Sequence, residues 1–89
     1  MNQSGFSLSI AASAKKGWQQ LRQGLRSRVE GELLQFPRRD PLRPKCRKHL
    51  QGRHDCSWEY RGLPKNDRIY YKVFDQEKKI RIFYCGDHP

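Results

Sequence analysis

Residues 56–85 read CSWEYRGLPKNDRIYYKVFDQEKKIRIFYC, and this stretch decides the fold. It contains three runs rich in Tyr, Ile, Val and Phe, which are enriched in β-strands. Turn-forming residues such as Gly, Pro, Asn and Asp separate the runs. We therefore expect three consecutive strands, paired as a meander, at 56–61, 68–74 and 79–85.

A short strand is expected at the other end of the chain, at residues 6–10. Phe6, Leu8 and Ile10 alternate there with two serines. A period of two places the apolar side chains on one face, as in a half-buried strand.

Two helices are expected between this strand and the meander. Apolar residues recur at spacings of three or four, the pattern of an amphipathic helix, at Trp18, Leu21, Leu25, Val29, Leu33 and Phe36. Gly24 interrupts the pattern, so we predict helices near 13–22 and 25–36, arranged as a hairpin or as one bent helix. Ser13 is the expected N-cap, and Pro37 ends the second helix.

The resulting element order is β-α-α-β-β-β. We expect one domain over residues 1–89, of the α+β class: a small, mostly antiparallel sheet with the helical hairpin packed on one face. A domain of this length buries only about 60% of its unfolded surface, so the core is thin.

The chain is strongly basic. Its 89 residues include 19 Lys and Arg against 9 Asp and Glu, which gives a net charge of +10. Such a charge favours phosphate backbones or an acidic partner. The basic run at 38–53 is either a solvated face or a phosphate contact, and the residues we select for the contact are Lys45, Arg47, Lys48 and Arg53.

The cysteines favour a reducing compartment, because three of them make a poor disulfide framework. No apolar run approaches the ~20 residues of a membrane span. Zinc ligands are conceivable in the group Cys46, His49, His54 and Cys56. Their spacing, C-x2-H-x4-H-x-C, matches no known finger, so we expect neither a metal site nor a cofactor.

Four landmarks in the second half of the chain resemble a known family. They are Leu50-Gln51-Gly52, Tyr60-Arg61, Arg68-Ile69-Tyr70-Tyr71 and Gly86-Asp87-His88. Their order after a β-α-α segment is similar to that of the RelE/ParE superfamily of bacterial toxins. The resemblance covers nearly the whole chain.

This resemblance implies a function. RelE-like members enter the ribosomal A site and cut mRNA without a metal ion, by attack of a ribose 2′-OH on the adjacent phosphate. They act in the cytoplasm and are held inactive by a cognate antitoxin. The chain is thus expected to be a ribosome-dependent endoribonuclease whose partners are an antitoxin, mRNA and ribosomal RNA.

The resemblance also suggests roles for individual residues. Arg61 and Arg68 match its strand arginines and suit phosphate binding. His88 is the expected general acid, and Glu59, which shares a strand face with Arg61, the expected base. Tyr84 is the expected platform for a splayed RNA base.

Two alternatives remain open at this point. ParE-like members share the fold but inhibit DNA gyrase without catalysis. A plain RNA- or ribosome-binding module would bind in a salt-sensitive way and cut nothing.

Overall fold

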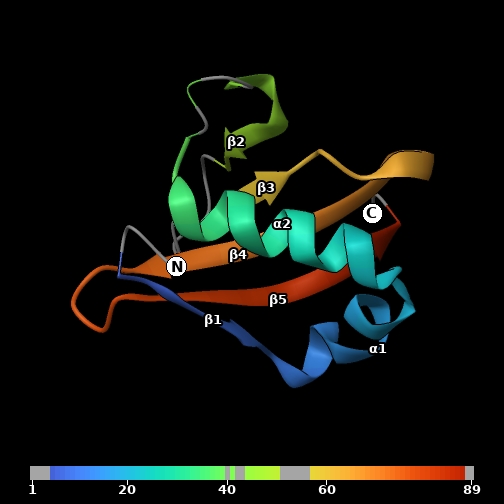
Figure 1. The fold of residues 1–89 in the computed structure, drawn as a ribbon, viewed down its shortest axis with the longest axis horizontal. Helices are drawn as coiled ribbons and strands as arrows, with labels where there is room; N and C mark the ends of the chain where they lie inside the picture. Colours follow the sequence, from blue (N-terminus) through green and yellow to red (C-terminus); the bar gives the residue numbers. More distant parts are fainter. Residues whose placement is uncertain (1–4, 40, 42–43, 51–56, 88–89) are drawn as a thin grey trace.

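The computed structural model describes residues 5–39, 41, 44–50 and 57–87, which form a sheet with two helices on one of its faces (Figure 1). Within these residues the sheet has five strands, in the spatial order β1-β5-β4-β3-β2. The strands are β1 (Ser7–Ile10), β2 (Arg47–His49), β3 (Trp58–Tyr60), β4 (Asp67–Phe74) and β5 (Lys79–Asp87). β1 is parallel to β5, and the other neighbouring pairs are antiparallel. The expected α+β architecture with a mostly antiparallel sheet is confirmed.

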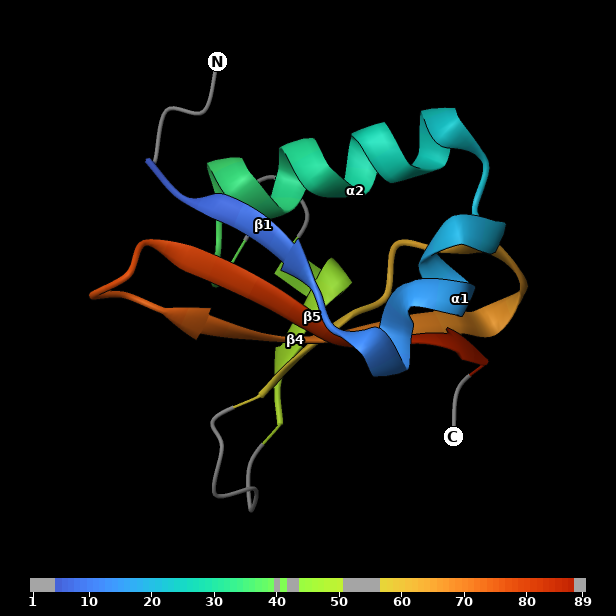
Figure 2. The same cartoon turned by 90° about the horizontal axis from the view of Figure 1, so that it is seen from below.

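The two helices are α1 (Ala12–Gln20) and α2 (Gln23–Gln35). Leu21 and Arg22 between them have extended dihedral angles, so the segment is a pair of helices and not one bent helix. Both lie on the same side of the sheet (Figure 2), as predicted. Neither of these described helices is long and apolar enough to cross a membrane.

The predicted N-cap at Ser13 is wrong. The N-cap residue of α1 is Ala11, which makes no side-chain cap, and Ser13 lies inside the first turn. Its hydroxyl instead donates to the carbonyl oxygen of Phe83 in β5, at 2.6 Å. A tertiary contact has therefore replaced the local capping bond that the sequence pattern favoured.

The predicted element order lacked one strand, β2. This strand has the sequence Arg47-Lys48-His49 and pairs antiparallel with β3. It was missed because three consecutive basic residues show no apolar alternation, which is the main signal of a half-buried strand. Its position is set by pairing with β3 and not by its own sequence.

The core fills the space between the helices and the sheet. Val29 and Leu33 of α2 are fully buried, and so are Tyr71 of β4 and Ile80 and Ile82 of β5. Trp18 packs against this core at its edge, as its place in the apolar stripe predicts. We call the sheet face that carries these strand residues the covered face.

Helix α1 packs directly on the backbone of β5 at Gly17. A Cβ atom at this position would lie 1.9 Å from the carbonyl oxygen of Cys85. Real Cβ atoms do not approach a backbone oxygen so closely, so the packing distance between α1 and β5 requires glycine here.

Candidate functional site

The described helices do not cover the opposite face of the sheet (Figure 2). This face carries charged and aromatic side chains. Alternate residues of a strand point to opposite faces. Because Ile69 and Tyr71 are buried on the covered face, Arg68, Tyr70 and Lys72 point to the other, which we call the open face. By register and contact, its other members on β2, β3 and β5 and just after β3 include Lys48, Glu59, Arg61, Arg81, Phe83 and Tyr84.

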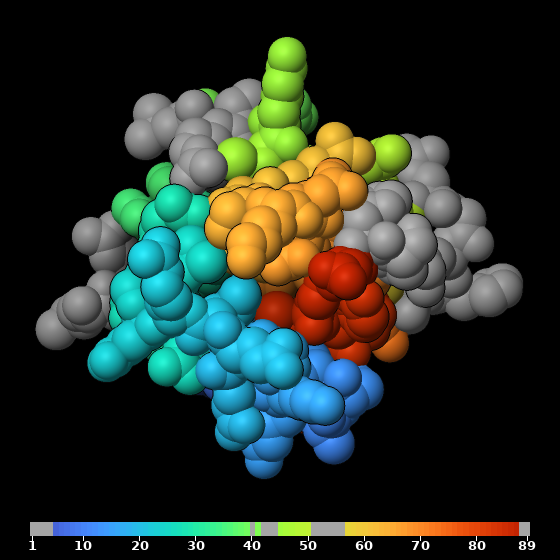
Figure 3. Space-filling model, turned by 90° about the vertical axis from the view of Figure 1, so that its right-hand side faces the viewer, coloured from blue at the N-terminus to red at the C-terminus, as the bar shows by residue number. Residues whose placement is uncertain are grey.

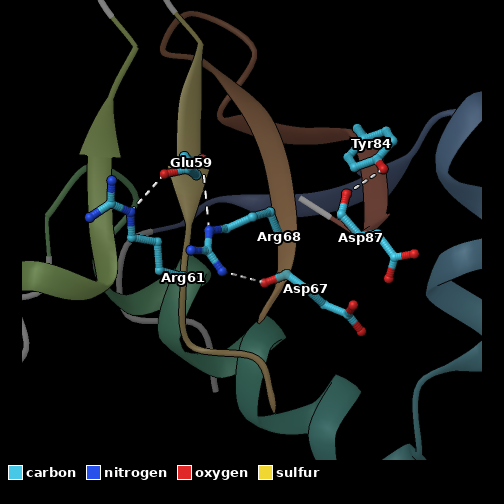
Figure 4. A network of polar contacts seen from close by, with 6 residues as sticks. All are labelled: Glu59, Arg61, Asp67, Arg68, Tyr84 and Asp87. Carbon is cyan, nitrogen blue, oxygen red and sulfur yellow. Dashed lines mark hydrogen bonds and ion pairs between the residues drawn. The ribbon is translucent and has the colours of Figure 1, made fainter. Parts of the chain in front are cut away.

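Glu59 of β3 lies on the open face and bridges two arginines (Figure 4). Nε of Arg61 donates to Oε1 of Glu59 at 2.7 Å, and Nε of Arg68 lies 3.9 Å from Oε2. Glu59 is only 3% exposed. A carboxylate shielded from water in this way is stabilised in its charged form by adjacent guanidinium groups.

The two arginines keep part of their hydrogen-bonding capacity for an external anion. The side chain of Arg61 is 40% exposed and that of Arg68 is 17% exposed. Arg68 also donates through Nη1 to the carbonyl oxygen of Asp67, at 3.1 Å, which fixes its direction (Figure 4). Two guanidinium groups against one carboxylate leave a net positive centre, suited to a phosphate group.

Two tyrosines stack beside this centre. The rings of Tyr70 and Tyr84 have centroids 5.3 Å apart and planes inclined by 29°. The Tyr84 hydroxyl donates to the carbonyl oxygen of Asp87 at 2.6 Å (Figure 4). Tyr70 was not among the expected site residues, although its spacing of two from Arg68 predicts a shared face.

A pair of carboxyl groups lies at the end of the sheet near α1. Asp67 and Asp87 are register partners on β4 and β5. Burial raises the pKa of the Asp67 carboxyl, and the hydrogen bond and charge of Asp87 raise it further. The pair borders a pocket of about 390 Å³ that α1, the 61–67 segment and the end of β5 enclose (Figure 3).

Cys85 lines the same pocket. Burial, with a smaller contribution from the Asp67 charge, raises the pKa of its thiol to about 11. The thiol is therefore protonated near neutral pH, and it lacks the thiolate character that a cysteine nucleophile needs.

Comparisons of sequence give no relative: neither a protein-family model nor a curated protein matches the chain. Comparisons of structure give matches that cover nearly the whole chain. A metal-bound toxin from Helicobacter pylori superposes with a TM-score of 0.75 at 20% identity, over 93% of this chain and 94% of that one. The toxin–antitoxin complex RelBE of E. coli gives 0.68 at 22% identity, over 94% and 98%. The archaeal RelE–RelB complex from Pyrococcus horikoshii gives 0.62 at 24%, over 93% and 94%.

The chain has the RelE fold. The superpositions include nearly all of this chain and of each of these three structures, so the fold implied by the sequence landmarks is confirmed.

Within the RelE fold, the expected catalytic residues meet in part. Glu59, Arg61 and Arg68 form one contact cluster, although Arg68 is on a different strand from Glu59. Tyr84 lies on the same open face. His88, the expected general acid, lies outside the described residues.

The expected basic contacts separate into three groups. Lys45 and Lys48 are exposed, as a phosphate contact requires, and Arg53 lies outside the described residues. Arg47 was wrongly assigned to the RNA-binding surface, because it is 5% exposed and lies on the covered face. Its Nη2 donates to the carbonyl oxygen of Glu32 at 2.7 Å, so it points into the protein.

Only two of the four residues considered as zinc ligands lie in the described part of the chain. Cys46 and His49 belong to the described residues, whereas His54 and Cys56 do not. Among the residues that the structure describes, no three His, Cys, Asp or Glu side chains are grouped as metal ligands. His49 contacts the ring of Trp58 instead, with centroids 4.8 Å apart.

Proposed function

We propose that this protein is the toxin of a type II toxin–antitoxin system and acts as a ribosome-dependent endoribonuclease on mRNA. The observation that carries the proposal is the Glu59–Arg61–Arg68 cluster on the open face of a RelE fold. A base beside two phosphate-binding cations is what cleavage by a neighbouring hydroxyl needs.

In the proposed reaction, the ribose 2′-OH attacks the adjacent phosphorus and the 5′-oxygen of the next nucleotide leaves. Glu59 accepts the proton of the 2′-OH, and His88 donates a proton to the leaving oxygen. Arg61 and Arg68 stabilise the charge that builds on the phosphate oxygens. The products are a 2′,3′-cyclic phosphate and a free 5′-hydroxyl, and no step of this scheme requires a metal ion.

The contacts of Glu59 suggest how substrate activates the base. In the free protein, Arg61 is hydrogen-bonded to the Glu59 carboxylate at 2.7 Å. An incoming phosphate competes for the same guanidinium group, because carboxylate and phosphate match its fork equally well. Transfer of Arg61 to the phosphate would break its hydrogen bond to Oε1 of Glu59, and the ribose hydroxyl could take the place of the guanidinium group.

The proposed partners follow from the same fold. Solved structures with it include RelBE complexes from E. coli and an archaeon, in which a toxin is bound to an antitoxin. We propose an antitoxin partner for this chain as well, and a cytoplasmic site of action, since translating ribosomes and mRNA are there.

The decisive experiment is mRNA cleavage in a purified translation system, with 5′ ends mapped by primer extension. The parent chain should give discrete cuts within codons that require ribosomes, and Arg68→Ala and His88→Ala should abolish them. Arg22→Ala removes a similar exposed charge from the helix side of the molecule and should cut like the parent. Intact mRNA under active translation would overturn the proposal and leave a binding or gyrase-inhibiting role.

The chemistry can be tested separately on the RNA. A message with a 2′-O-methyl group at the mapped nucleotide should resist cleavage at that site alone, because the nucleophile is absent. Cleavage at an undiminished rate would exclude attack by the 2′-OH.

A further inference from the structure

Strand β5 contains a bulge at the middle of the open face. Tyr70 is paired with Tyr84 and Tyr71 with Ile82, so Phe83 is an extra residue without a partner on β4. Strict alternation would send Phe83 and Tyr84 to opposite faces. The extra residue lets both point to the open face, a common effect of bulges near functional sites.

Contacts with Tyr70 confirm this arrangement. Its ring lies 5.3 Å from that of Tyr84 and 6.3 Å from that of Phe83, measured between centroids. Three aromatic rings therefore form a continuous row along the open face.

The start of α1 holds the bulge in place. The Ser13 hydroxyl donates to the carbonyl oxygen of Phe83 at 2.6 Å, and the Ala11 amide donates to that of Ile82 at 2.8 Å. These bonds satisfy carbonyl oxygens to which the N–H groups of a neighbouring strand would otherwise donate, so the position of the Phe83 ring is built into the fold.

Two cations accompany Phe83 at the end of the row that is remote from Glu59. Nζ of Lys72 lies 5.4 Å from the centroid of the Phe83 ring, within the range of a cation–π contact. Arg81 is the register partner of Lys72, is exposed, and donates to the Ser9 hydroxyl at 3.1 Å. None of these three residues takes part in the reaction proposed above.

We propose that Lys72, Arg81 and Phe83 form a second subsite for single-stranded RNA, in which the cations bind a phosphate and the ring stacks on a base. This subsite rests on the proposed function, since it would hold RNA next to the nucleotide that is cut. Cations beside sequence-tolerant aromatic platforms are the usual design of single-strand binding surfaces. An acidic peptide would use the cations but has no need of the ring.

The geometry along β4 is compatible with one continuous strand of RNA. Arg68, Tyr70 and Lys72 follow one another at alternate positions, with about 6.7 Å between successive side chains. The path from the arginine cluster to the second subsite is therefore about 13 Å, a length that a few nucleotides span. RNA lying along β4 would pass over the stacked tyrosines on the way.

The first test measures binding without cleavage. A fluorescein-labelled 12-nucleotide 2′-O-methyl RNA is titrated with the parent chain and with Lys72→Ala/Arg81→Ala, by anisotropy at several salt concentrations. The double variant should bind at least tenfold more weakly, and the slope of log K against log salt should fall by about 1.4, or 0.7 for each lost contact. Lys15→Ala/Lys16→Ala removes the same charge from exposed positions of α1 and should change neither quantity comparably.

Three results would overturn the subsite: equal RNA binding by the Lys72→Ala/Arg81→Ala variant and the parent, an equal loss in the α1 control, or parent binding of an acidic peptide in preference to RNA. The ring is tested by Phe83→Leu, which should weaken binding about fivefold, the low end of the value of one stacked base. Phe83→Trp should restore it. If the Phe83→Leu variant binds the RNA as tightly as the parent, the Phe83 ring does not stack on a base.

The translation assay separates this inference from the proposed function. If the parent cuts mRNA and the Lys72→Ala/Arg81→Ala variant cuts equally well at the same sites, the subsite is wrong and the nuclease stands. If the parent binds RNA through Lys72 and Arg81 but cuts nothing, the subsite stands and the nuclease is wrong.

Discussion

Among the residues that the structure describes, each face of the sheet buries one charged side chain, and the groups that surround it differ between the two faces. Glu59 on the open face is 3% exposed and lies between two guanidinium groups. Arg47 on the covered face is 5% exposed, and within the described part of the chain it makes no hydrogen bond to a carboxylate. It donates to a helix carbonyl and lies over the ring of Tyr60, 5.6 Å from the centroid, while its Nε and Nη1 have no partner among the described residues.

Arg47 and Glu59 differ in the kind of group that stabilises their charge. The charge of Arg47 is met by dipoles and a π face, which suffice for packing but offer nothing to a substrate. The charge of Glu59 is met by groups that an incoming phosphate can exchange. The same strand alternation thus yields a core on one side and a charged cluster on the other.

The largest effect should come from Glu59→Gln. The substitution keeps the shape of the side chain but removes the proposed base, and general base catalysis contributes about 100-fold or more, so cleavage in the translation assay should fall by at least that factor. Arg47→Met, the matched change on the covered face, should cleave within about twofold of the parent. Full activity of Glu59→Gln would show that Glu59 only orients the arginines.

The next effect is on the covered face at Gly17. Gly17→Ala places a Cβ against the backbone oxygen of Cys85, which cannot move like a flexible side chain. The free energy of unfolding, measured with urea, should fall by about 3 kcal/mol. Gly31→Ala in α2, where no described atom outside the adjoining residues and helix backbone lies within 4 Å of the new Cβ, should instead raise it by about 0.5 kcal/mol. Equal free energies of unfolding for the two variants would show that α1 can move away from β5 to make room for the new Cβ atom.

A smaller effect is expected for the stability of Arg47→Met. A long apolar side chain can fill the same space without burying an incompletely paired charge. The free energy of unfolding should therefore change by less than about 1 kcal/mol, whereas Arg47→Ala leaves a cavity and should lose about 2 kcal/mol. Urea midpoints at constant m-value give both numbers. If Arg47→Met lowers the free energy of unfolding as much as Arg47→Ala does, the positive charge of Arg47 itself is required for stability.

The smallest effect concerns the Asp67–Asp87 pair at the end of the sheet. The pKa of Asp67 is raised by burial and by Asp87, so the folded state binds protons more tightly than the unfolded chain. Its contribution to stability is present at low pH and is lost as the pH rises from about 3.8 through the raised value. Asp87→Asn removes the opposing charge and should raise stability at pH 7 by about 0.5 kcal/mol while flattening the pH dependence. A steeper pH dependence in urea titrations would contradict this origin of the shift.

Local patterns in the sequence were sufficient for most of the fold. The runs of β-forming residues at 68–74 and 79–85 and the apolar stripe of 18–36 predicted their strands and helices to within a few residues. They also placed Glu59 and Arg61 on one face, because that inference needs only the alternation within a single strand. These elements form where their own side chains favour them.

Tertiary structure decided the rest, because the deciding partners are far apart in the chain. β2 is a strand only because β3 pairs with it, and Arg47 is buried only because α2 covers it. Arg68 of β4 reaches Glu59 on the neighbouring strand β3. The Ser13 hydroxyl does not cap α1 and instead donates to the carbonyl oxygen of Phe83, 70 residues away. This bond supports the bulge that turns Phe83 and Tyr84 to the same face. Residue spacing predicts none of these contacts, because each one depends on which surfaces come together when the chain folds.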